Sequence, residues 1–453
     1  MIENKLTIVI PSNNVKERMY TCNVLFGELL RVGFDIRVDE NEINTIIEGS
    51  EKKVCIEDHF FNKFPADLSY LRKENIPVQC TFFHDLNGRS IPMVFGIDKL
   101  ETHDDEIICG LDIIASSFFM LSRWEEYVQG RQEYGKCDEQ LLFSVRNNLC
   151  SIPLVHLYEV LLANLLCGLN NYSTTNRSFK IKPTHDVDRC YLTGWGELLS
   201  NVKRIFKAGN KKKARKLLSD FIWYKLFKPE PFNTFKYFCS CADSFGIKDS
   251  FFFKCCENNE PGFTYTINED RVGQQLDVPR ELGHVLGFHP SESTFNNTAQ
   301  FMKELHRLNS ATNNVTVCGR NHGLYCNTFT YKQWEAAGAE YVSNFGFQHR
   351  FGYRCGIAVR FPLFDLYERR QLKLYELPFV IMDTVMYRNH PEIELVMNEI
   401  KGIVDDVINY NGELCLNWHT NVFNMPEMRK YKKVYKFIFN YANNEMAKKR
   451  MHF

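Results

Sequence analysis

From residue 179 onward, short apolar runs alternate with segments of helical periodicity. Strand-like runs cover 179–183, 250–253, 285–288, 315–318, 341–347 and 413–418, and helical patterns include 297–308 and 331–337. Repeated strand–helix units form a parallel sheet or barrel. This alternation predicts an α/β fold for residues 179–453. In such folds the catalytic side chains gather at the carboxyl ends of the strands, so candidate site residues are expected there.

The first 150 residues predict a separate, smaller α/β domain. Residues 6–10 and 54–56 are strand-like apolar runs, and 19–32 and 110–127 have apolar helical faces. Arg123 and Glu125, within the last of these segments, are expected to form internal ion pairs. We predict three parts: an N-terminal α/β domain of residues 1–150, a helix and polar linker over 151–178, and the larger domain of residues 179–453.

The composition narrows the class of protein and its location. The 55 basic residues balance the 55 acidic ones, which gives no electrostatic argument for nucleic acid as a partner. The 16 cysteines include no CxxC pair, and the start of the chain lacks the pattern of a signal peptide. Unpaired thiols without an export signal favour the cytoplasm. No apolar run reaches the ~18 residues of a membrane span.

One basic segment, residues 203–228, interrupts the strand–helix alternation. It contains the runs 211–213 and 215–216 of lysine and arginine, followed by several large apolar residues. One interpretation is a solvated helical face packed on the larger domain. The other is an amphipathic segment that contacts a membrane surface or an anionic lipid-linked substrate.

Two aspartates lie at the end of the first strand of the larger domain. Asp186 and Asp188 are separated by one residue in Thr184-His-Asp-Val-Asp188. Alternate residues share a face of a strand, and with a turn at the strand end both carboxylates can enter one pocket. Two neighbouring carboxylates repel each other unless a cation or a shared proton intervenes. The motif therefore predicts a metal with an adjacent base, and the alternative is a helix cap with a surface pair.

Histidine and arginine side chains follow three further strands. His289 ends the run 285–288 and is a candidate metal ligand, although a lone histidine there is more often structural. Arg320 offers a planar donor fork that suits a carboxylate, and His322 is a further candidate ligand. His419 ends the last strand and could act as a general acid. His284 is the poorer candidate because it lies five residues upstream of His289, on the opposite face of the strand.

Together these motifs resemble the polysaccharide deacetylases of the NodB-homology, or carbohydrate esterase 4, type. More narrowly, the chain resembles a Bacteroidetes-type subgroup with a Thr-His-Asp-Val-Asp motif and an N-terminal domain of unknown function. The resemblance covers nearly the whole chain and rests on 121–126, 184–188, 283–291, 320–322, 351–356, 376–378, 382–383 and 418–419.

The resemblance implies a distorted (β/α) barrel of fewer than eight strands and a role for each matching residue. Asp186 corresponds to the general base and Arg320 to the arginine that orients it. His419 corresponds to the histidine that protonates the leaving amine. Asp188 and His289 correspond to ligands of a divalent metal, expected to be Zn²⁺.

The chain departs from the family at the metal. Ser293 occupies the position of the second metal-binding histidine, and Val342 replaces an aspartate common in the subgroup. We expect His322 to complete an Asp-His-His ligand set, since a catalytic metal usually has three protein ligands. Asp383 is a candidate to compensate for Val342, but the sequence does not place it.

These features predict a metal-dependent hydrolase that removes N-acetyl groups from amino sugars. The expected substrate is an acetylated amino-sugar glycan or a lipid-linked glycan intermediate. Two alternatives stay open at this stage. One is a hydrolase of another linear amide or of an O-acetyl ester. The other is a degenerate, metal-free domain that binds glycan or acts as a scaffold.

Overall fold

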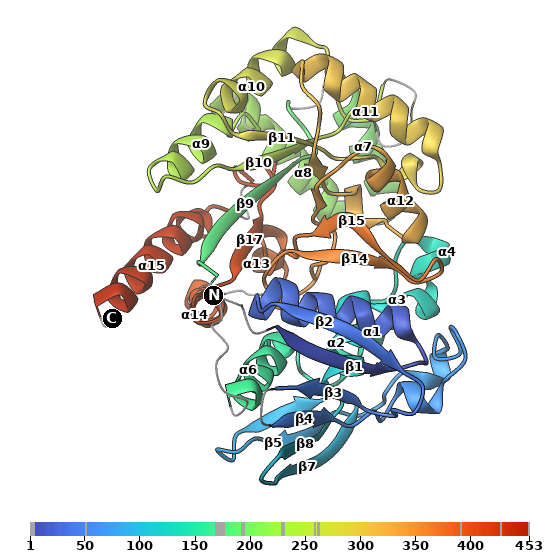
Figure 1. Cartoon of the computed structure of the whole chain (residues 1–453). Coiled ribbons are helices and arrows are strands. Elements are labelled where there is room, and N and C mark those ends of the chain that lie inside the picture. The colour runs from blue at the N-terminus through green and yellow to red at the C-terminus, as the bar shows by residue number, and fades with distance from the viewer. Residues whose placement is uncertain are drawn as a thin grey trace.

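Two large β-sheets organise the computed structural model (Figure 1). The structure describes residues 5–49, 52–167, 177–191, 195–227, 232–257, 260, 263–389, 392–425 and 428–451. Most of the predicted linker after residue 167 lies outside these ranges. None of the helices within them is both long enough and apolar enough to cross a membrane.

The first sheet has six strands in the order β2-β1-β3-β4-β8-β7. Alternation along β1 sends Leu6, Ile8 and Ile10 into the main core and Val9 to the opposite face. The strands are β1 Leu6–Pro11, β2 Phe34–Asp39, β3 Thr45–Glu48, β4 Lys53–Ile56, β7 Gly96–Thr102 and β8 Glu106–Leu111, with a separate hairpin of β5 Thr81–His84 and β6 Ser90–Met93.

The helices of this part pack between the two sheets. Helices α1 and α2 contact each other and the β14–β15 edge of the second sheet, and Tyr20 donates a hydrogen bond to the carbonyl of Pro362 at 2.9 Å. The helices are α1 Val15–Cys22, the π-helix η1 Asn23–Leu30, α2 Ile113–Ser122, α3 Trp124–Glu126, α4 Gln132–Tyr134, α5 Phe143–Arg146 and α6 Leu154–Cys167; short helical turns are η2 Phe61–Lys63, η3 Lys73–Asn75, η4 Tyr127–Arg131 and η5 Glu139–Leu141.

The predicted helix over 110–127 is divided in the structure. Its first residues belong to β8, and Arg123 breaks it with a left-handed φ of 53°. The buried Arg123 bonds Glu125 at 2.6 Å and Glu126 at 2.9 Å, which confirms the predicted internal pairs. Glu126 also bonds Arg354 at 2.8 Å, so this buried network joins the N-terminal part to the second sheet.

The second sheet has nine strands in the order β14-β15-β13-β12-β11-β10-β9-β17-β16. All are parallel except β14, which runs antiparallel to β15. The strands are β9 Lys180–Val187, β10 Ser250–Phe253, β11 Val285–Phe288, β12 Cys318–Gly319, β13 Tyr341–Val342, β14 Phe361–Asp365, β15 Arg370–Glu376, β16 Ile381–Met382 and β17 Glu413–Asn417.

This arrangement confirms the α/β class but not the predicted barrel. Among the described residues the sheet ends on β14 and β16 and does not close, and its nine strands exceed the expected number. Helices cover it in Figure 1. They are α9 Phe235–Asp243, α10 Asp270–Glu281, α11 Thr298–Thr312, α12 Thr328–Ala336, α13 Asp383–Asn389, α14 Ile393–Asn409 and α15 Lys432–Met451, with the turns η6 Glu292–Thr294 and η7 His322–Leu324.

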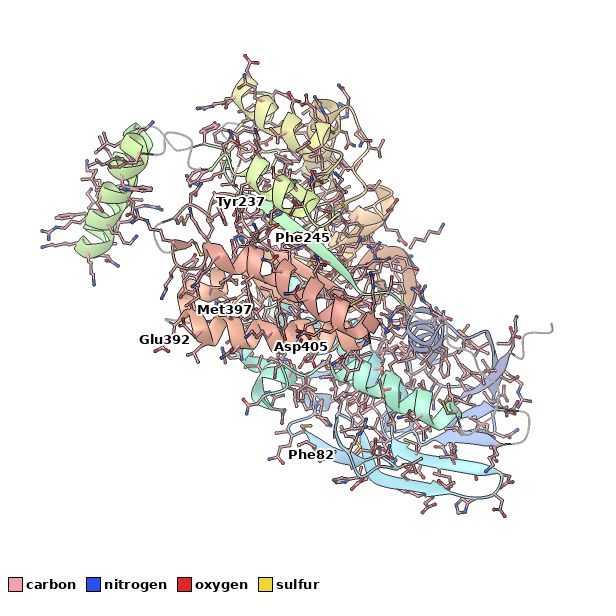
Figure 2. The ribbon with its side chains drawn as sticks, turned by 90° about the vertical axis from the view of Figure 1, so that its left-hand side faces the viewer. Phe82, Tyr237, Phe245, Glu392, Met397 and Asp405 are labelled. Atoms are coloured by element: carbon pink, nitrogen blue, oxygen red, sulfur yellow. The ribbon has the colours of Figure 1, made fainter. Side chains whose placement is uncertain are left out.

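The basic segment forms a helical hairpin between β9 and β10. It consists of α7 Trp195–Lys207 and α8 Lys211–Phe227, which pack chiefly on each other. Figure 2 shows the hairpin, in green, set apart from the rest of the molecule. The segment is therefore helical as expected, but it is not a face packed along the larger sheet. Residue 228, the last of the predicted segment, lies outside the described residues.

Candidate active site

All six predicted site residues lie at the carboxyl edge of the second sheet. Asp186 is near the end of β9, and Asp188 follows that strand. His289 follows β11 directly. Arg320 and His322 follow β12, and His419 comes two residues after the end of β17. Because these strands are parallel and neighbouring, their ends bring the six side chains to one place.

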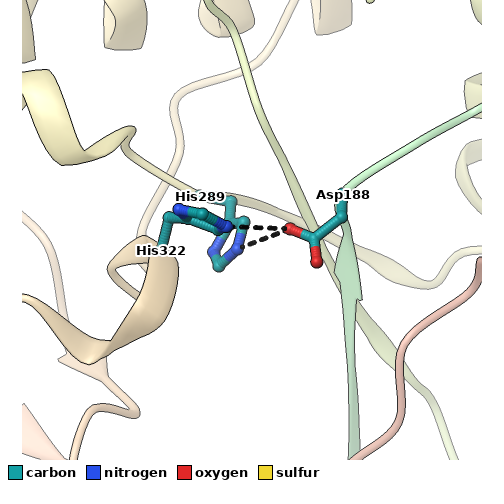
Figure 3. Close-up of side chains that lie close together, drawn as sticks. All are labelled: Asp188, His289 and His322. Carbon is teal, nitrogen blue, oxygen red and sulfur yellow. Dashed lines mark ion pairs between the residues drawn. The ribbon is translucent and has the colours of Figure 1, made fainter. Parts of the chain in front are cut away.

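Asp188, His289 and His322 form the first cluster of the site (Figure 3). One ligand atom from each lies within 4.8 Å of the other two. Asp188 Oδ1 is 3.3 Å from His289 Nε2 and 3.7 Å from His322 Nε2. The two imidazole planes are almost perpendicular, at 87°. The carboxylate and the two rings thus face a common point from three directions.

The protonation of His289 shows what this cluster can bind. His289 Nδ1 lies 2.6 Å from the carbonyl oxygen of Arg320. Because a carbonyl oxygen can only accept a hydrogen bond, Nδ1 is the donor and carries the hydrogen. In the neutral ring Nε2 then presents a lone pair to Asp188. Within the described part of the chain, the buried Asp188 Oδ1 has no hydrogen-bond partner. Electron-rich atoms facing each other fit a cation between them.

His322 is also suited to a metal. Burial, followed by the neighbouring His289 and Lys254, lowers the pKa of His322 to about 3, so the ring is neutral at pH 7. A neutral imidazole is the form that binds divalent metals. Ser293, at the family's usual position, instead has its hydroxyl 2.7 Å from the hydroxyl of Ser291.

Asp186 and Arg320 form a second, fully buried group. Arg320 donates to Asp186 Oδ1 at 2.8 Å, to Thr184 Oγ1 at 2.8 Å and to the carbonyl of Ser343 at 2.6 Å. Asn417 Nδ2 donates to the other oxygen, Asp186 Oδ2, at 3.0 Å. Burial raises the pKa of Asp186, but Arg320 and the neighbouring histidines outweigh it and lower the value to about 2. Asp186 is therefore ionised and fixed in orientation.

His419 is held by a residue that the sequence could not place. Asp383, the first residue of α13, accepts hydrogen bonds from the His419 backbone N–H and from its Nδ1, both at 2.8 Å. His419 Nε2 then faces Asp186 Oδ2 at 3.7 Å. Burial lowers the pKa of His419, but Asp383 and then Asp186 and Asp188 raise it to about 9. Asp383 therefore orients and charges His419 and does not replace the aspartate missing at Val342.

Lys254 is a further charged residue that the sequence analysis missed. It follows β10, is 3% exposed, and its Nζ lies 3.7 Å from Asp188 Oδ1. Its place directly after a predicted strand was the only signal available. Its ammonium adds a positive charge beside the cluster of Asp188, His289 and His322.

A second group of potential ligands lies at the opposite edge of the sheet. Cys239, Asp249 and His284 are close enough to share an ion. However, His284 Nδ1 accepts a hydrogen bond from the Asp249 backbone N–H at 2.9 Å, so its other nitrogen carries the proton in the neutral ring. His284 thus lacks a free lone pair, in agreement with its ranking as a poorer candidate than His289.

Comparisons with known proteins give limited similarity. A family model described as a family of unknown function (DUF7033) matches residues 6–171. No curated protein matches the chain. The solved structures include a candidate polysaccharide deacetylase from Mycobacterium smegmatis, 12% identical with a TM-score of 0.38 over 59% of this chain and 86% of that one.

A second structure is a candidate polysaccharide deacetylase involved in O-antigen biosynthesis from Bordetella bronchiseptica. It is 14% identical, with a TM-score of 0.30 over 58% of this chain and 81% of that one. Similarities of this size do not define an activity, so we argue the function from the geometry of the site.

Proposed function

We propose that this chain is a metal-dependent hydrolase that removes N-acetyl groups from the amino sugars of a polysaccharide or its biosynthetic intermediate. The observation that supports this most is that the potential metal ligands and the Asp186–His419 pair lie beside each other at one edge of the second sheet. Three potential metal ligands, one carboxylate and two imidazoles, lie together, and beside them an ionised Asp186 faces a protonated His419. Metal-assisted amide hydrolysis combines a metal that polarises the carbonyl, a base that activates water and an acid that protonates the leaving nitrogen.

The ligands of the proposed metal are Asp188, His289 and His322, and their two nitrogens and one oxygen suit Zn²⁺. When bound, such a metal polarises a carbonyl oxygen and lowers the pKa of water toward 7. The hydrogen bond from His289 Nδ1 to the Arg320 carbonyl keeps the ring in the tautomer whose Nε2 can bind a metal.

Asp186 would remove a proton from the water that attacks the acetyl carbonyl carbon. Arg320 holds one of its oxygens, and the other lies on the side of His419. His419, protonated at neutral pH, would then give a proton to the sugar nitrogen as the carbon–nitrogen bond breaks. The products are acetate and a free amino sugar, so atoms and protons balance.

A metal-exchange assay tests the proposed activity. The purified chain is treated with a chelator, reloaded with Zn²⁺, and supplied with N-acetylated amino-sugar oligomers while acetate release is measured. We expect about one metal ion per chain, loss of acetate release after chelation, and its recovery on reloading. Acetate release that is insensitive to chelation would contradict the metal-dependent mechanism. The absence of release by the loaded chain from a panel of such glycans would contradict the substrate class.

Replacing His419 separates the roles of acid and ligand. We expect His419→Ala to lower turnover roughly 100-fold, because general acid catalysis contributes at least about that factor. Metal content should stay unchanged, as measured by elemental analysis. His419 Nε2 is 4.0 Å from Asp188 Oδ2, so a ligand role is a real alternative. Loss of the metal in this variant would show that His419 is a ligand and that its assignment as the acid is wrong.

The predicted cytoplasmic location leads us to favour a biosynthetic intermediate over finished cell wall as substrate. An intermediate of surface-polysaccharide synthesis is made on the cytoplasmic side, where a lipid carrier can hold the growing glycan. The substrate is therefore a free or a lipid-linked glycan, and measuring acetate release from each kind distinguishes the two.

A further inference from the structure

We propose that the α7–α8 hairpin, residues 195–227, binds the surface of an anionic phospholipid membrane. This binding goes beyond hydrolysis and does not depend on it. Three observations support it: the charge of the hairpin, its exposed apolar side chains, and its position next to the candidate active site.

The hairpin concentrates positive charge within a chain that is neutral as a whole. Residues 195–227 contain nine basic and two acidic residues, whereas the whole chain is formally neutral. The rest of the chain therefore carries a net charge of minus seven. Lys203, Arg204, Lys207, Lys211 and Lys212 are exposed on both sides of the turn between the helices. A charge separated in this way is attracted to an anionic surface through one end of the molecule.

Large apolar side chains are exposed on the same two helices. Leu199 and Phe206 lie two turns apart on one face of α7, with 56% and 52% of their surface exposed. At the end of α8, Leu226 and Phe227 are 69% and 68% exposed, and Ile222, one turn earlier, is 41% exposed. Helices that combine lysine and arginine with exposed Leu and Phe insert the apolar side chains at the headgroup boundary of a membrane.

The apolar side chains favour a membrane over a nucleic acid. Nucleic acids attract lysine and arginine through their phosphates and stack on aromatic rings. They offer much less apolar surface than a bilayer for exposed aliphatic side chains such as Leu199, Ile222 and Leu226. An anionic bilayer offers phosphates for the basic residues and an apolar interior for the aliphatic ones.

The hairpin is joined to the loops that carry the site. It begins seven residues after Asp188, and seven residues of chain span at most about 25 Å. The guanidinium of Arg429, ten residues after His419, lies 4.5 Å from the centre of the Trp223 ring in α8. A membrane-bound hairpin therefore keeps the site near the bilayer, where a lipid-linked glycan is anchored. This consequence for the substrate rests on the proposed function, whereas the binding itself does not.

Flotation with lipid vesicles tests the binding directly. The full-length, metal-loaded chain is mixed with vesicles of phosphatidylcholine, with or without phosphatidylglycerol, and the bound fraction is measured at low and high salt. We expect binding only when phosphatidylglycerol is present, and weaker binding at high salt. A single-stranded and a duplex DNA oligonucleotide serve as competing anionic probes.

Two hairpin variants and one matched control localise the binding. Charge reversal of Lys211, Lys212 and Arg215 to Glu should weaken it at least 100-fold, since each basic residue contributes about fivefold near an anionic membrane. Leu226→Ser with Phe227→Ser should weaken it roughly tenfold through lost apolar burial. Charge reversal of the exposed lysines 16, 63 and 73 in the N-terminal part should change it little.

Acetate release from a soluble oligomer should be unchanged in all three variants, which shows that they fold and that the site is intact. No binding to phosphatidylglycerol vesicles, or binding that survives both hairpin variants, would overturn the proposal. Tighter binding to DNA that is insensitive to the Leu226 and Phe227 substitutions would instead assign the hairpin to nucleic acid. Failure of deacetylation with intact vesicle binding would affect only the proposed function.

Discussion

The Asp186→Asn variant is expected to bind the proposed metal as the wild type does and to lose about 100- to 10,000-fold in turnover, which is the usual contribution of a general base. Asparagine has the shape of aspartate and can still accept the hydrogen bond from Arg320, but its amide cannot take a proton from water. Asp186 Oδ2 faces His419 Nε2 at 3.7 Å, and Asp186 is outside the cluster of three potential metal ligands. Its loss should therefore affect the reaction and leave metal binding intact.

Stability has to be measured alongside turnover. The substitution removes the carboxylate charge beside the fully buried Arg320, and breaking a buried pair can cost about 3–5 kcal/mol of unfolding free energy. Turnover is therefore compared per folded, metal-loaded molecule, at a temperature well below the unfolding transition.

Asp249→Asn is the matched control for this experiment. Asp249 is equally buried but lies at the opposite edge of the sheet, just before β10. It should retain near-normal turnover. Near-normal deacetylation by Asp186→Asn itself would rule out Asp186 as the base.

The sequence predicted the centre of the second sheet better than its ends. The six predicted strands correspond to β13, β12, β11, β10, β9 and β17, which are consecutive in the sheet. Parallel strands buried on both faces read as continuous apolar runs, as in 250–253, where all four residues are buried. The missed strands β14, β15 and β16 lie at the ends of the sheet, where β15 alternates between exposed and buried residues and β16 has only two residues.

Two of the predicted strands, 315–318 and 341–347, are shorter in the structure, where they are β12 Cys318–Gly319 and β13 Tyr341–Val342. The run 341–347 is strand only at Tyr341–Val342, because the backbone then turns toward the site. Ser343 offers its carbonyl to Arg320, and the N–H groups of Asn344 and Phe345 donate to Glu376. These side-chain partners replace the bonds of a continuing strand, and an apolar pattern contains no sign of them.

In the candidate site too, residues next to a recognisable strand could be predicted, whereas a residue placed by a long-range contact could not. Asp186, Asp188, His289, Arg320, His322 and His419 were predicted because each follows or ends a recognisable strand. Asp383 follows a strand too short to recognise, and its contact with His419 joins residues 36 positions apart. Lys254 follows a predicted strand, but a lysine at a strand end has no pattern that distinguishes it from a surface residue.

His322→Ala is expected to weaken metal binding at least about 100-fold, as severely as His289→Ala. Outer residues that only orient a ligand already cost about 10- to 100-fold in affinity, so loss of a direct ligand should cost more. The Nε2 atoms of His289 and His322 lie 3.3 Å and 3.7 Å from Asp188 Oδ1, so both imidazoles are placed to share an ion with that carboxylate. With His322 removed, Asp188 and His289 would be left as a two-ligand site, which holds a catalytic metal weakly.

Ser293→Ala provides the control that separates this ligand set from the family's usual one. The Ser293 hydroxyl is bonded to Ser291, whose own hydroxyl donates to Glu304 at 2.6 Å, so it belongs to a neighbouring hydrogen-bond network. Its loss should leave metal affinity nearly unchanged. Metal affinity is measured by competition with a chelating dye for the wild type and the three variants. Full metal occupancy in His322→Ala at the concentration that half-saturates His289→Ala would exclude His322 as a ligand. It would also remove the main structural support for a three-ligand catalytic metal in this chain.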